Sequence, residues 1–412
     1  MANWYPKCVQ FTRMRRLSRL VLLFSYYYSQ LLGIVRFAYN IKTGAVRTTL
    51  RITLYSIWAN ISLVVVVVLW HNEKINTILL NSKYLHHRIY FIMTIIRGIT
   101  VVVTLIFNWT RRCKFMEVIV EFQNLRVQHF TDLPIRDELQ RQFEKCIITK
   151  FYLSIFAEIS LWALSLETLY SILDWSLVRS GFSMFVLTNI LTVMTYHFYF
   201  GILYVSHHFR ILNDELEIVM QTACMVGRRY QCQRRPGIYF TQCCELADRL
   251  DELAVAHRKL QDLTNRILNM FSLQGICVVF NMYLNNIGMF FIVYALFKSN
   301  AFILSMSIWA AILMILTVVS YYADINKFLN VMLDLLQYYQ DTAAMLKLST
   351  PTQVLDVRFE QSVEQFCLQI AQNPLEIKIL GLFLFDKPMA FDIFVSTLLT
   401  AVFVMQYDYQ YF

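Results

Sequence analysis

The chain has 412 residues, of which 57% are hydrophobic and only 16% are charged. A soluble globular domain carries about 45–50% apolar and about 25% charged residues. With so few charges, a water-soluble chain of this length could not hide its apolar side chains in one core. Only 10 glycines and 6 prolines are present, which excludes collagen and proline-rich linkers. The composition therefore indicates a protein that crosses a membrane several times, and we expect its fold to be all-α because the apolar runs have the length of spanning helices.

The net charge of +9 raises the question of a nucleic-acid partner, because basic surfaces bind phosphate backbones. Here, however, the lysines and arginines lie between the hydrophobic runs, where charges set the orientation of membrane segments. The sequence therefore predicts a lipid bilayer as partner and no nucleic acid.

Eight apolar runs approach the roughly 20 residues that a membrane-spanning helix needs. They are Leu20–Phe37, Ile52–Trp70, Ile89–Phe107, Phe151–Leu173, Phe182–Val205, Leu268–Phe297, Phe302–Tyr322 and Phe391–Gln406. The first run contains three consecutive tyrosines and Arg36, which is typical of an interfacial or re-entrant helix rather than a full span. We therefore predict seven transmembrane helices, preceded by one amino-terminal helix that associates with the membrane.

The distribution of lysine and arginine predicts the orientation of these spans. If the amino terminus is cytoplasmic, the inside segments carry 30 basic residues and the outside segments carry 5. Seven crossings then place the carboxyl terminus outside the cell. None of the 9 cysteines falls in an outside loop on this map, so we expect no disulfide framework.

This map divides the chain into segments of alternating environment. We expect a cytoplasmic amino-terminal segment with the membrane-associated helix (1–50), transmembrane helices 1–4 (51–207) with a cytoplasmic helical loop (109–148), a cytoplasmic helical loop (208–267), transmembrane helices 5–6 (268–325), a cytoplasmic helical segment (326–388), and a last transmembrane helix with a short extracellular tail (389–412). The inside segments carry leucines at helical spacing among charged residues. They are either a platform that joins subunits or helices that pack on their own subunit.

Sequence signatures of catalysis are absent. There is no HExxH, no glycine-rich phosphate loop, no Gly-x-Ser-x-Gly and no CxxC pair. The 8 histidines are too few and too scattered for a membrane di-iron site, and we interpret His207 and His208, at the inner end of a span, as solvated. We predict no enzymatic activity, no cofactor and no metal site.

Ionisable residues inside spans are costly, so they indicate either a packing interaction or a functional site. Arg97 and Glu167 lie at a similar depth, and we expect them to form an interhelical ion pair or to line a polar pocket open to the outside. Aromatic and amide residues gather in the outer halves of the spans, which favours a pocket for a small organic ligand. The candidate pocket residues are Tyr90, Arg97, Trp162, Glu167, Tyr170, Asn189, Asn285, Asn286, Phe290 and Trp309.

The carboxyl-terminal region holds three motifs in order: Asn373-Pro374-Leu375-Glu376-Ile377, then Gly381-Leu382-Phe383-Leu384-Phe385-Asp386, then an apolar helix ending in Gln406-Tyr407. This order is similar to that of the insect gustatory receptors. Their last helix carries Thr-Tyr, five apolar residues and Gln-Phe. Here Leu399 and Thr400 stand at the Thr-Tyr pair and Tyr407 stands at the Phe, so the chain resembles a divergent, bitter- or pheromone-type member.

The resemblance implies a ligand-gated, nonselective channel for monovalent and divalent cations that is opened by a small organic tastant. It also implies a homo- or heterotetramer of gustatory receptor subunits in the plasma membrane of sensory neuron dendrites. The last span would line the pore, and the cytosolic helices would anchor the tetramer. Gln406 would lie near the outer constriction, with gate residues Val402, Phe403 and Met405.

Two other classes are alternatives to a channel. A G-protein-coupled-type receptor also has seven spans, but its orientation is opposite and its helices are usually kinked by prolines, whereas none of the 6 prolines here interrupts a span. A small-molecule transporter breaks its helices with glycine and proline and often contains inverted repeats. We find no such repeat in the sequence, so the channel is the favoured hypothesis.

Overall fold

The computed structural model describes residues 13–40, 45–70, 85–131, 133–170, 175–233, 236–297, 308–348, 356–379 and 383–411, although some side chains near the gaps lie outside this description. The helices are α1 (Arg13–Leu31), α2 (Leu50–Trp70), α4 (Leu85–Thr110), α5 (Arg112–His129), α6 (Asp137–Tyr170), α7 (Trp175–Gln233), α8 (Pro236–Phe297), α9 (Ile308–Leu348), α10 (Val357–Gln372) and α11 (Lys387–Tyr411). Two small antiparallel hairpins pair β1 (Ala38–Tyr39) with β2 (Val46–Arg47) and β3 (Lys378–Ile379) with β4 (Phe383–Leu384).

Six helices are long and apolar enough to cross a membrane within the described residues. These stretches are Ile92–Thr110, Asp137–Ala163, Phe185–Tyr230, Pro236–Gly288, Ile312–Lys347 and Lys387–Gln410. A shorter apolar helix, Leu50–Val65, corresponds to the predicted first span. The prediction of a nearly all-helical chain with many apolar helices is therefore confirmed.

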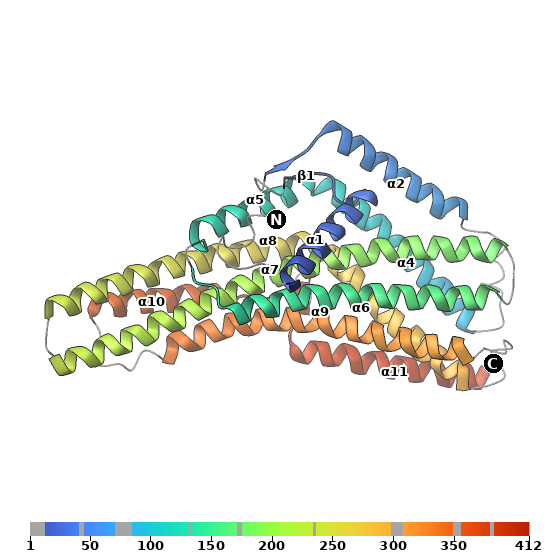
Figure 1. Cartoon of the computed structure of the whole chain (residues 1–412). Coiled ribbons are helices and arrows are strands. Elements are labelled where there is room, and N and C mark those ends of the chain that lie inside the picture. Colours follow the sequence, from blue (N-terminus) through green and yellow to red (C-terminus); the bar gives the residue numbers. More distant parts are fainter. Residues whose placement is uncertain are drawn as a thin grey trace.

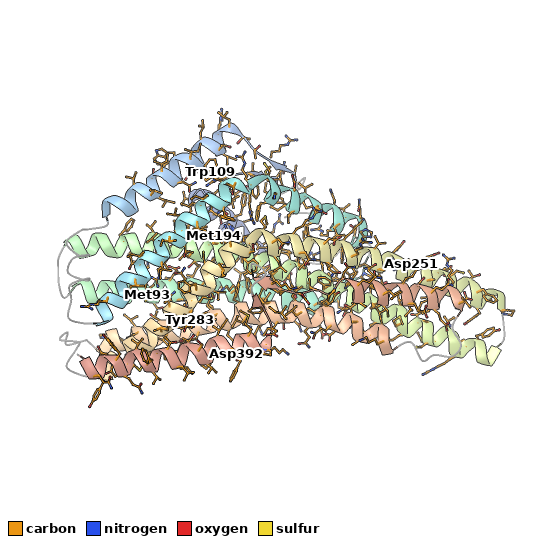
Figure 2. The ribbon with its side chains drawn as sticks, turned by 180° about the vertical axis from the view of Figure 1, so that it is seen from behind. Met93, Trp109, Met194, Asp251, Tyr283 and Asp392 are labelled. Atoms are coloured by element: carbon orange, nitrogen blue, oxygen red, sulfur yellow. The ribbon has the colours of Figure 1, made fainter. Side chains whose placement is uncertain are left out.

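The helices α7 and α8 run without interruption for 59 and 62 residues. At 1.5 Å per residue each is about 90 Å long, roughly three times the thickness of a hydrocarbon core. Both helices therefore extend far beyond any membrane region. They form an antiparallel pair at the narrow end of the molecule, together with α10 and the end of α9 (Figure 1). Figure 2 places Asp251 in this narrow part, and Met93 and Tyr283 in the broad part.

A leucine-rich core fills the narrow part of the bundle. Leu250, Leu260 and Leu263 on α8 are fully buried, as are Leu335 on α9 and Phe359 on α10. This leucine stripe packs within its own chain, and the interpretation of these helices as a platform that joins subunits stays a prediction.

The amino-terminal helix α1 crosses α6 and α7 obliquely (Figure 1). The Oη of Tyr28 donates a hydrogen bond to Asn189 Oδ1 at 2.8 Å, and Ser29 Oγ lies 2.8 Å from His197 Nε2. The chain turns away after Gly33, whose φ of +69° is a left-handed conformation that glycine adopts without strain. Polar contacts to α7 thus fix α1 against the bundle.

An ion pair between a buried lysine and a half-buried aspartate joins α6 to α9. Lys150 is 1% exposed, and its Nζ lies 2.7 Å from Asp324 Oδ2. Ser154 Oγ donates a hydrogen bond to the other carboxylate oxygen of Asp324 at 2.6 Å. A buried charge is stable only when it is paired and hydrogen-bonded, and this arrangement meets both conditions.

We expect Asp324→Ala to lower the free energy of unfolding by about 3 kcal/mol, because the Lys150 ammonium then stays buried without its partner. The double variant Lys150→Met with Asp324→Leu should cost much less, since no unpaired charge remains. Thermal unfolding of the purified protein in lipid nanodiscs measures both effects. Equal destabilisation by the single and the double variant would contradict a paired role.

His257 lies in the narrow part of α8, in a charge-rich stretch that precedes the apolar run beginning at Leu268. It is 1% exposed, and the rings of Phe209, Tyr339 and Phe366 surround it at 5.3–5.4 Å between centroids. Neither ring nitrogen has a hydrogen-bond partner in the part of the chain that the structure describes. Burial lowers the pKa of His257 from 6.5 to about 4.

Between these two pKa values the unfolded chain binds a proton that the folded chain does not, so stability falls as the pH drops through this window. From pH 7 to pH 5, His257 alone should remove about 2 kcal/mol from the free energy of unfolding. The His257→Phe variant keeps an aromatic ring but no proton site, and should lose that part of the pH dependence. Unfolding measured at both pH values tests this expectation; an identical slope in variant and wild type would refute it.

Candidate functional site

A cavity of about 300 Å³ lies in the broad part of the bundle and is lined by α4, α6, α7, α8 and α9. We call it the central cavity. Its volume is at the lower end of the range for small-molecule pockets, and its walls mix apolar and polar side chains. The polar lining residues are Arg97, Lys150, Ser154, Glu158, Thr188, Thr192, Thr195, Asn281, Asn285, Thr317, Tyr321 and Asp324.

Hydrogen bonds between α4 and α8 form one wall of the central cavity. Arg97 Nη2 donates to Asn285 Oδ1 at 2.6 Å. About one turn away, Asn281 Nδ2 donates to Thr100 Oγ1 at 2.5 Å. The side chain of Glu167, the predicted partner of Arg97, lies outside the described residues. Asn285 is therefore one partner that the structure gives Arg97 in this cavity.

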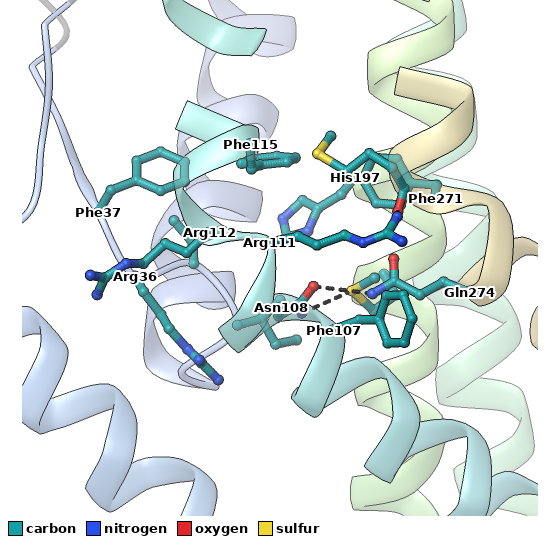
Figure 3. Close-up of a pocket in the computed structure, with 14 residues that line it drawn as sticks. Arg36, Phe37, Phe107, Asn108, Arg111, Arg112, Phe115, His197, Phe271 and Gln274 are labelled. Carbon is teal, nitrogen blue, oxygen red and sulfur yellow. Dashed lines mark hydrogen bonds between the residues drawn. The ribbon is translucent and has the colours of Figure 1, made fainter. Parts of the chain in front are cut away.

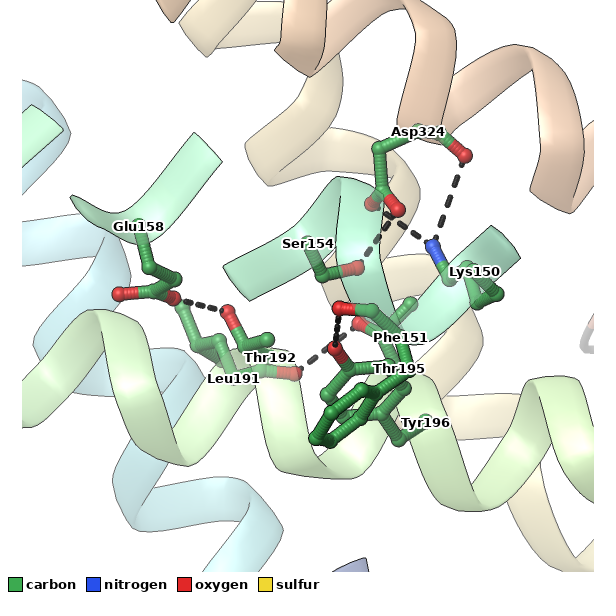
Figure 4. Close-up of polar contacts among 9 residues, drawn as sticks. All are labelled: Lys150, Phe151, Ser154, Glu158, Leu191, Thr192, Thr195, Tyr196 and Asp324. Atoms are coloured by element: carbon green, nitrogen blue, oxygen red, sulfur yellow. Dashed lines mark hydrogen bonds and ion pairs between the residues drawn. The ribbon is translucent and has the colours of Figure 1, made fainter. Parts of the chain in front are cut away.

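The acidic groups of the central cavity are each hydrogen-bonded (Figure 4). Thr192 Oγ1 on α7 donates to Glu158 Oε1 on α6 at 2.6 Å. Asp324 on α9 accepts from Ser154 and pairs with Lys150. The described lining thus holds two basic and two acidic side chains, so the cavity offers hydrogen-bond donors and acceptors of both charge signs to a ligand.

The structure brings together only some of the residues predicted to line a ligand pocket. Arg97 and Asn285 meet in the central cavity. Trp162 and Asn189 line a second cavity between α1, α6 and α7. Asn286 lines a third, between α8, α9 and α11, with a volume of about 550 Å³.

The remaining predicted pocket residues lie elsewhere. The ring of Phe290 on α8 is 6.2 Å from that of Tyr322 on α9, measured between centroids. Trp309, near the start of α9, is 68% exposed on the surface. The side chains outside the described residues are those of Tyr90, Glu167 and Tyr170.

Sequence reasoning did not identify Lys150 and Asp324 as a pair. Lys150 directly precedes one predicted span and Asp324 follows another by two residues, positions at which charges are ordinarily solvated. The feature of the sequence that could have indicated this pair is the opposite charge of the two residues at the ends of two apolar runs. Using it requires knowing that α6 and α9 are neighbours, which follows from packing and not from either run alone.

The interpretation of His207 and His208 as solvated is wrong, because they are only 9% and 6% exposed. The ring of His207 stacks on Phe143 at 4.4 Å between centroids. The ring of His208 forms T-shaped contacts with Phe122 and Phe130, at 4.9 and 4.8 Å between centroids. The physical reason is that α7 continues past these histidines, so that they pack against α5, α6 and the loop between them instead of lying in a loop of their own.

A small pocket of about 40 Å³ lies where α4 passes into α5, beside α7 and α8 (Figure 3). Gln274 Nε2 on α8 donates to Asn108 Oδ1 at 3.2 Å. Arg111 Nη1 donates to the carbonyl oxygens of Asn269 and Met270 at 2.8 and 3.1 Å. Because the pocket has room for only a few waters, we interpret this cluster as a packing contact that fixes the α4–α5 turn against α8.

The last helix, α11, has a buried face and an exposed face. Thr397 and Ala401 are 0% and 2% exposed and belong to the side that packs on α8. Met405 is half-buried between the two faces. The exposed face carries residues three and four positions apart, which one side of a helix presents together. Among them are Val402, Phe403 and Gln406.

These features define a helical membrane protein with a ligand-sized cavity, lined by apolar and polar side chains, between its helices and an exposed apolar helix at its carboxyl end. The family model described as 7tm chemosensory receptor matches residues 22–411 of the chain. The chain therefore belongs to the 7tm chemosensory receptor family.

The relatives of this chain are insect gustatory receptors. It is 28% identical over 395 residues to the Drosophila melanogaster protein named "Putative gustatory receptor 36c", covering 94% of this chain and 97% of that protein. It is 21% identical to the Drosophila melanogaster protein named "Gustatory receptor for bitter taste 22e", covering 93% and 94% of the two chains. The predicted resemblance to this family is confirmed.

Among solved structures, the fold is similar to that of the insect olfactory receptor OR5 from Machilis hrabei in complex with eugenol. The TM-score is 0.67 at 10% sequence identity, over 95% of this chain and 98% of that chain. At this identity the likeness concerns the fold alone. It covers nearly the whole chain, so it includes the narrow part of the bundle as well as the apolar part.

Proposed function

We propose that this chain is a subunit of a ligand-gated, nonselective cation channel that is opened by a small organic tastant. Membership of a chemosensory receptor family supports a receptor rather than an enzyme, and the gustatory relatives support taste as the sensory quality. The olfactory receptor structure with a similar fold is a complex with the small organic molecule eugenol. The observation that carries the proposal is the central cavity, a space of small-molecule size between the helices whose mainly apolar walls also carry hydrogen-bonding side chains.

In this proposal the tastant binds in the central cavity and acts through α8. The bond between Arg97 and Asn285 joins α4 to α8, so a ligand that competes for either group changes the contact between these helices. Two residues before Asn285, the Oη of Tyr283 lies 2.8 Å from Thr400 Oγ1 on α11. A movement of α8 at the cavity would therefore reach α11 directly.

We propose that α11 lines the pore of a homo- or heterotetramer and that monovalent and divalent cations pass along it. Its exposed face supports this role, because it combines the apolar Val402 and Phe403 with the amide of Gln406. Such a surface can dewet when the pore is closed and contact ions when it is open. Met405 would lie beside Val402 and Phe403 and form the gate with them. The extramembrane parts of α7, α8, α9 and α10 would hold the four subunits together.

The proposed topology has seven spans, with the amino terminus in the cytoplasm and the carboxyl terminus outside. The division of basic residues, 30 against 5, supports it. The receptor would lie in the plasma membrane of sensory neuron dendrites. The alternatives are a G-protein-coupled-type receptor, whose carboxyl terminus would be cytoplasmic, and less favourably a small-molecule transporter.

We expect Asn285→Leu to shift the tastant concentration needed for half-maximal current by about tenfold or more, because it removes the acceptor of Arg97 from the cavity wall. The current carried by each open channel should stay the same. Dose–response recordings from cells that express the chain measure the first quantity, and single-channel recordings measure the second. A changed unitary current with an unchanged dose–response curve would contradict the assignment of the cavity.

We expect Gln406→Ala to change the unitary conductance or the preference among cations, since it removes an amide from the proposed pore face. Thr397→Ala is the control, because it also shortens a polar side chain to alanine, but on the buried face of the same helix. Reversal potentials in solutions of different cations provide the measurement. If the two variants conduct alike, α11 does not line the pore with this face.

A further inference from the structure

The second cavity, between α1, α6 and α7, has a volume of about 570 Å³. We call it the lateral cavity. Phe24 and Ile159 in its lining are 55% and 61% exposed, so the cavity reaches the outer surface of the bundle. Its volume falls within the range for drug-sized ligands. It is separated from the central cavity by a wall that both share, formed by Ser154, Glu158 and Thr192.

Aromatic rings form much of the lateral cavity. Phe24 on α1 meets Phe151 on α6 edge to face at 5.7 Å between centroids. Trp162 on α6 meets Phe185 on α7 in the same manner at 4.0 Å. Aromatic faces carry partial negative charge and attract cations, most strongly in the case of tryptophan.

The charge of the lateral cavity distinguishes it from the central cavity. Among the described residues that line it, Glu158 is the only acidic one, and there is no lysine, arginine or histidine. The central cavity shares Glu158 but is also lined by Arg97 and Lys150. Aromatic faces around a single carboxylate, without a basic residue, match the chemistry of an ammonium group.

Three buried polar atoms of the lining have no hydrogen-bond partner among the described residues. They are Ser25 Oγ, Glu158 Oε2 and Trp162 Nε1. Buried polar atoms are ordinarily paired, and the other carboxylate oxygen of Glu158 accepts from Thr192. An ammonium group can donate to the carboxylate and to the serine oxygen. The indole N–H needs an acceptor, such as an ether or hydroxyl oxygen, elsewhere on the ligand.

The helix α1 completes this cavity, because it contributes Phe24, Ser25 and Tyr28 to the lining. The hydrogen bond from Tyr28 to Asn189 holds α1 against α7 beside the cavity. A ligand in the lateral cavity therefore contacts α1, α6 and α7 at once.

We propose that the lateral cavity is a second ligand site, selective for a small amphipathic amine that is protonated at neutral pH. Glu158 is its counter-ion, and the aromatic rings surround its apolar body. This site is distinct from the proposed tastant site. Because Glu158 and Thr192 belong to both linings, an amine bound in the lateral cavity also changes the wall of the central cavity.

Saturation binding of tritiated phenylbutylamine to the purified full chain in phosphatidylcholine nanodiscs tests this proposal, with phenylbutanol as the uncharged probe of matched shape. Glu158→Gln should weaken the affinity for the amine by about tenfold or more and that for the alcohol by less than about twofold. Equal effects on the two probes, or no saturable binding of the amine to the wild type, would overturn the proposal.

Two further variants locate the bound amine. Ile155→Trp adds bulk to the lateral cavity alone and should weaken amine binding by about tenfold or more. Asn285→Leu alters the central cavity alone and should leave the affinity within about twofold. The reverse pattern would place the amine in the central cavity and overturn the proposal.

Cross-linking of wild-type protein by a diazirine derivative of phenylbutylamine covers the case in which Ile155→Trp does not fold. Label on α1 and α7 is expected, and label confined to α8 and α9 would contradict the assignment. These experiments need no current, so their failure is distinguishable from failure of the channel proposal.

Discussion

The ion pair between Lys150 and Asp324 is the interaction on which the arrangement of this receptor most depends. It joins α6 to α9 where the apolar part of the bundle meets the charged part, and Ser154 completes its hydrogen bonding. A membrane interior offers no partner to a lone charge, so the two helices are held in one relative position. The central cavity is the space that remains between helices fixed in this way.

The long helix α8 connects the parts of the molecule that the proposed function requires. Its charged half packs in the leucine-rich core around Leu260, and its apolar half carries Asn285 into the central cavity. Tyr283, on the same stretch, contacts α11. An uninterrupted helix satisfies its own backbone hydrogen bonds in lipid and in water. It can therefore pass between the two environments without a hinge, so that cavity, exposed helix and extramembrane core are mechanically linked.

The class and the family of this protein can be predicted well from its sequence. Apolar runs and basic residues can be recognised from short stretches of chain, and the carboxyl-terminal motifs occur in the same order as in the gustatory receptors. The sequence predicts the length of α7 poorly, since the polar residues after Val205 end the apolar run but not the helix. The same continuation explains why His208 is buried. Which side chains share a cavity depends on helix packing, so Arg97 and Asn285 meet while Trp162 faces the lateral cavity. The spacing of residues along the sequence does not indicate which helices pack together around a cavity.

In the proposed channel, four subunits surround one pore lined by α11. Native mass spectrometry of the purified receptor, released from lipid nanodiscs, counts the chains in each particle directly. We expect particles of four chains, either four copies of this chain or this chain with co-subunits. Particles of one or two chains, with no larger species in the presence of lipid and co-subunits, would contradict this expectation, because so few copies of α11 cannot enclose a pore.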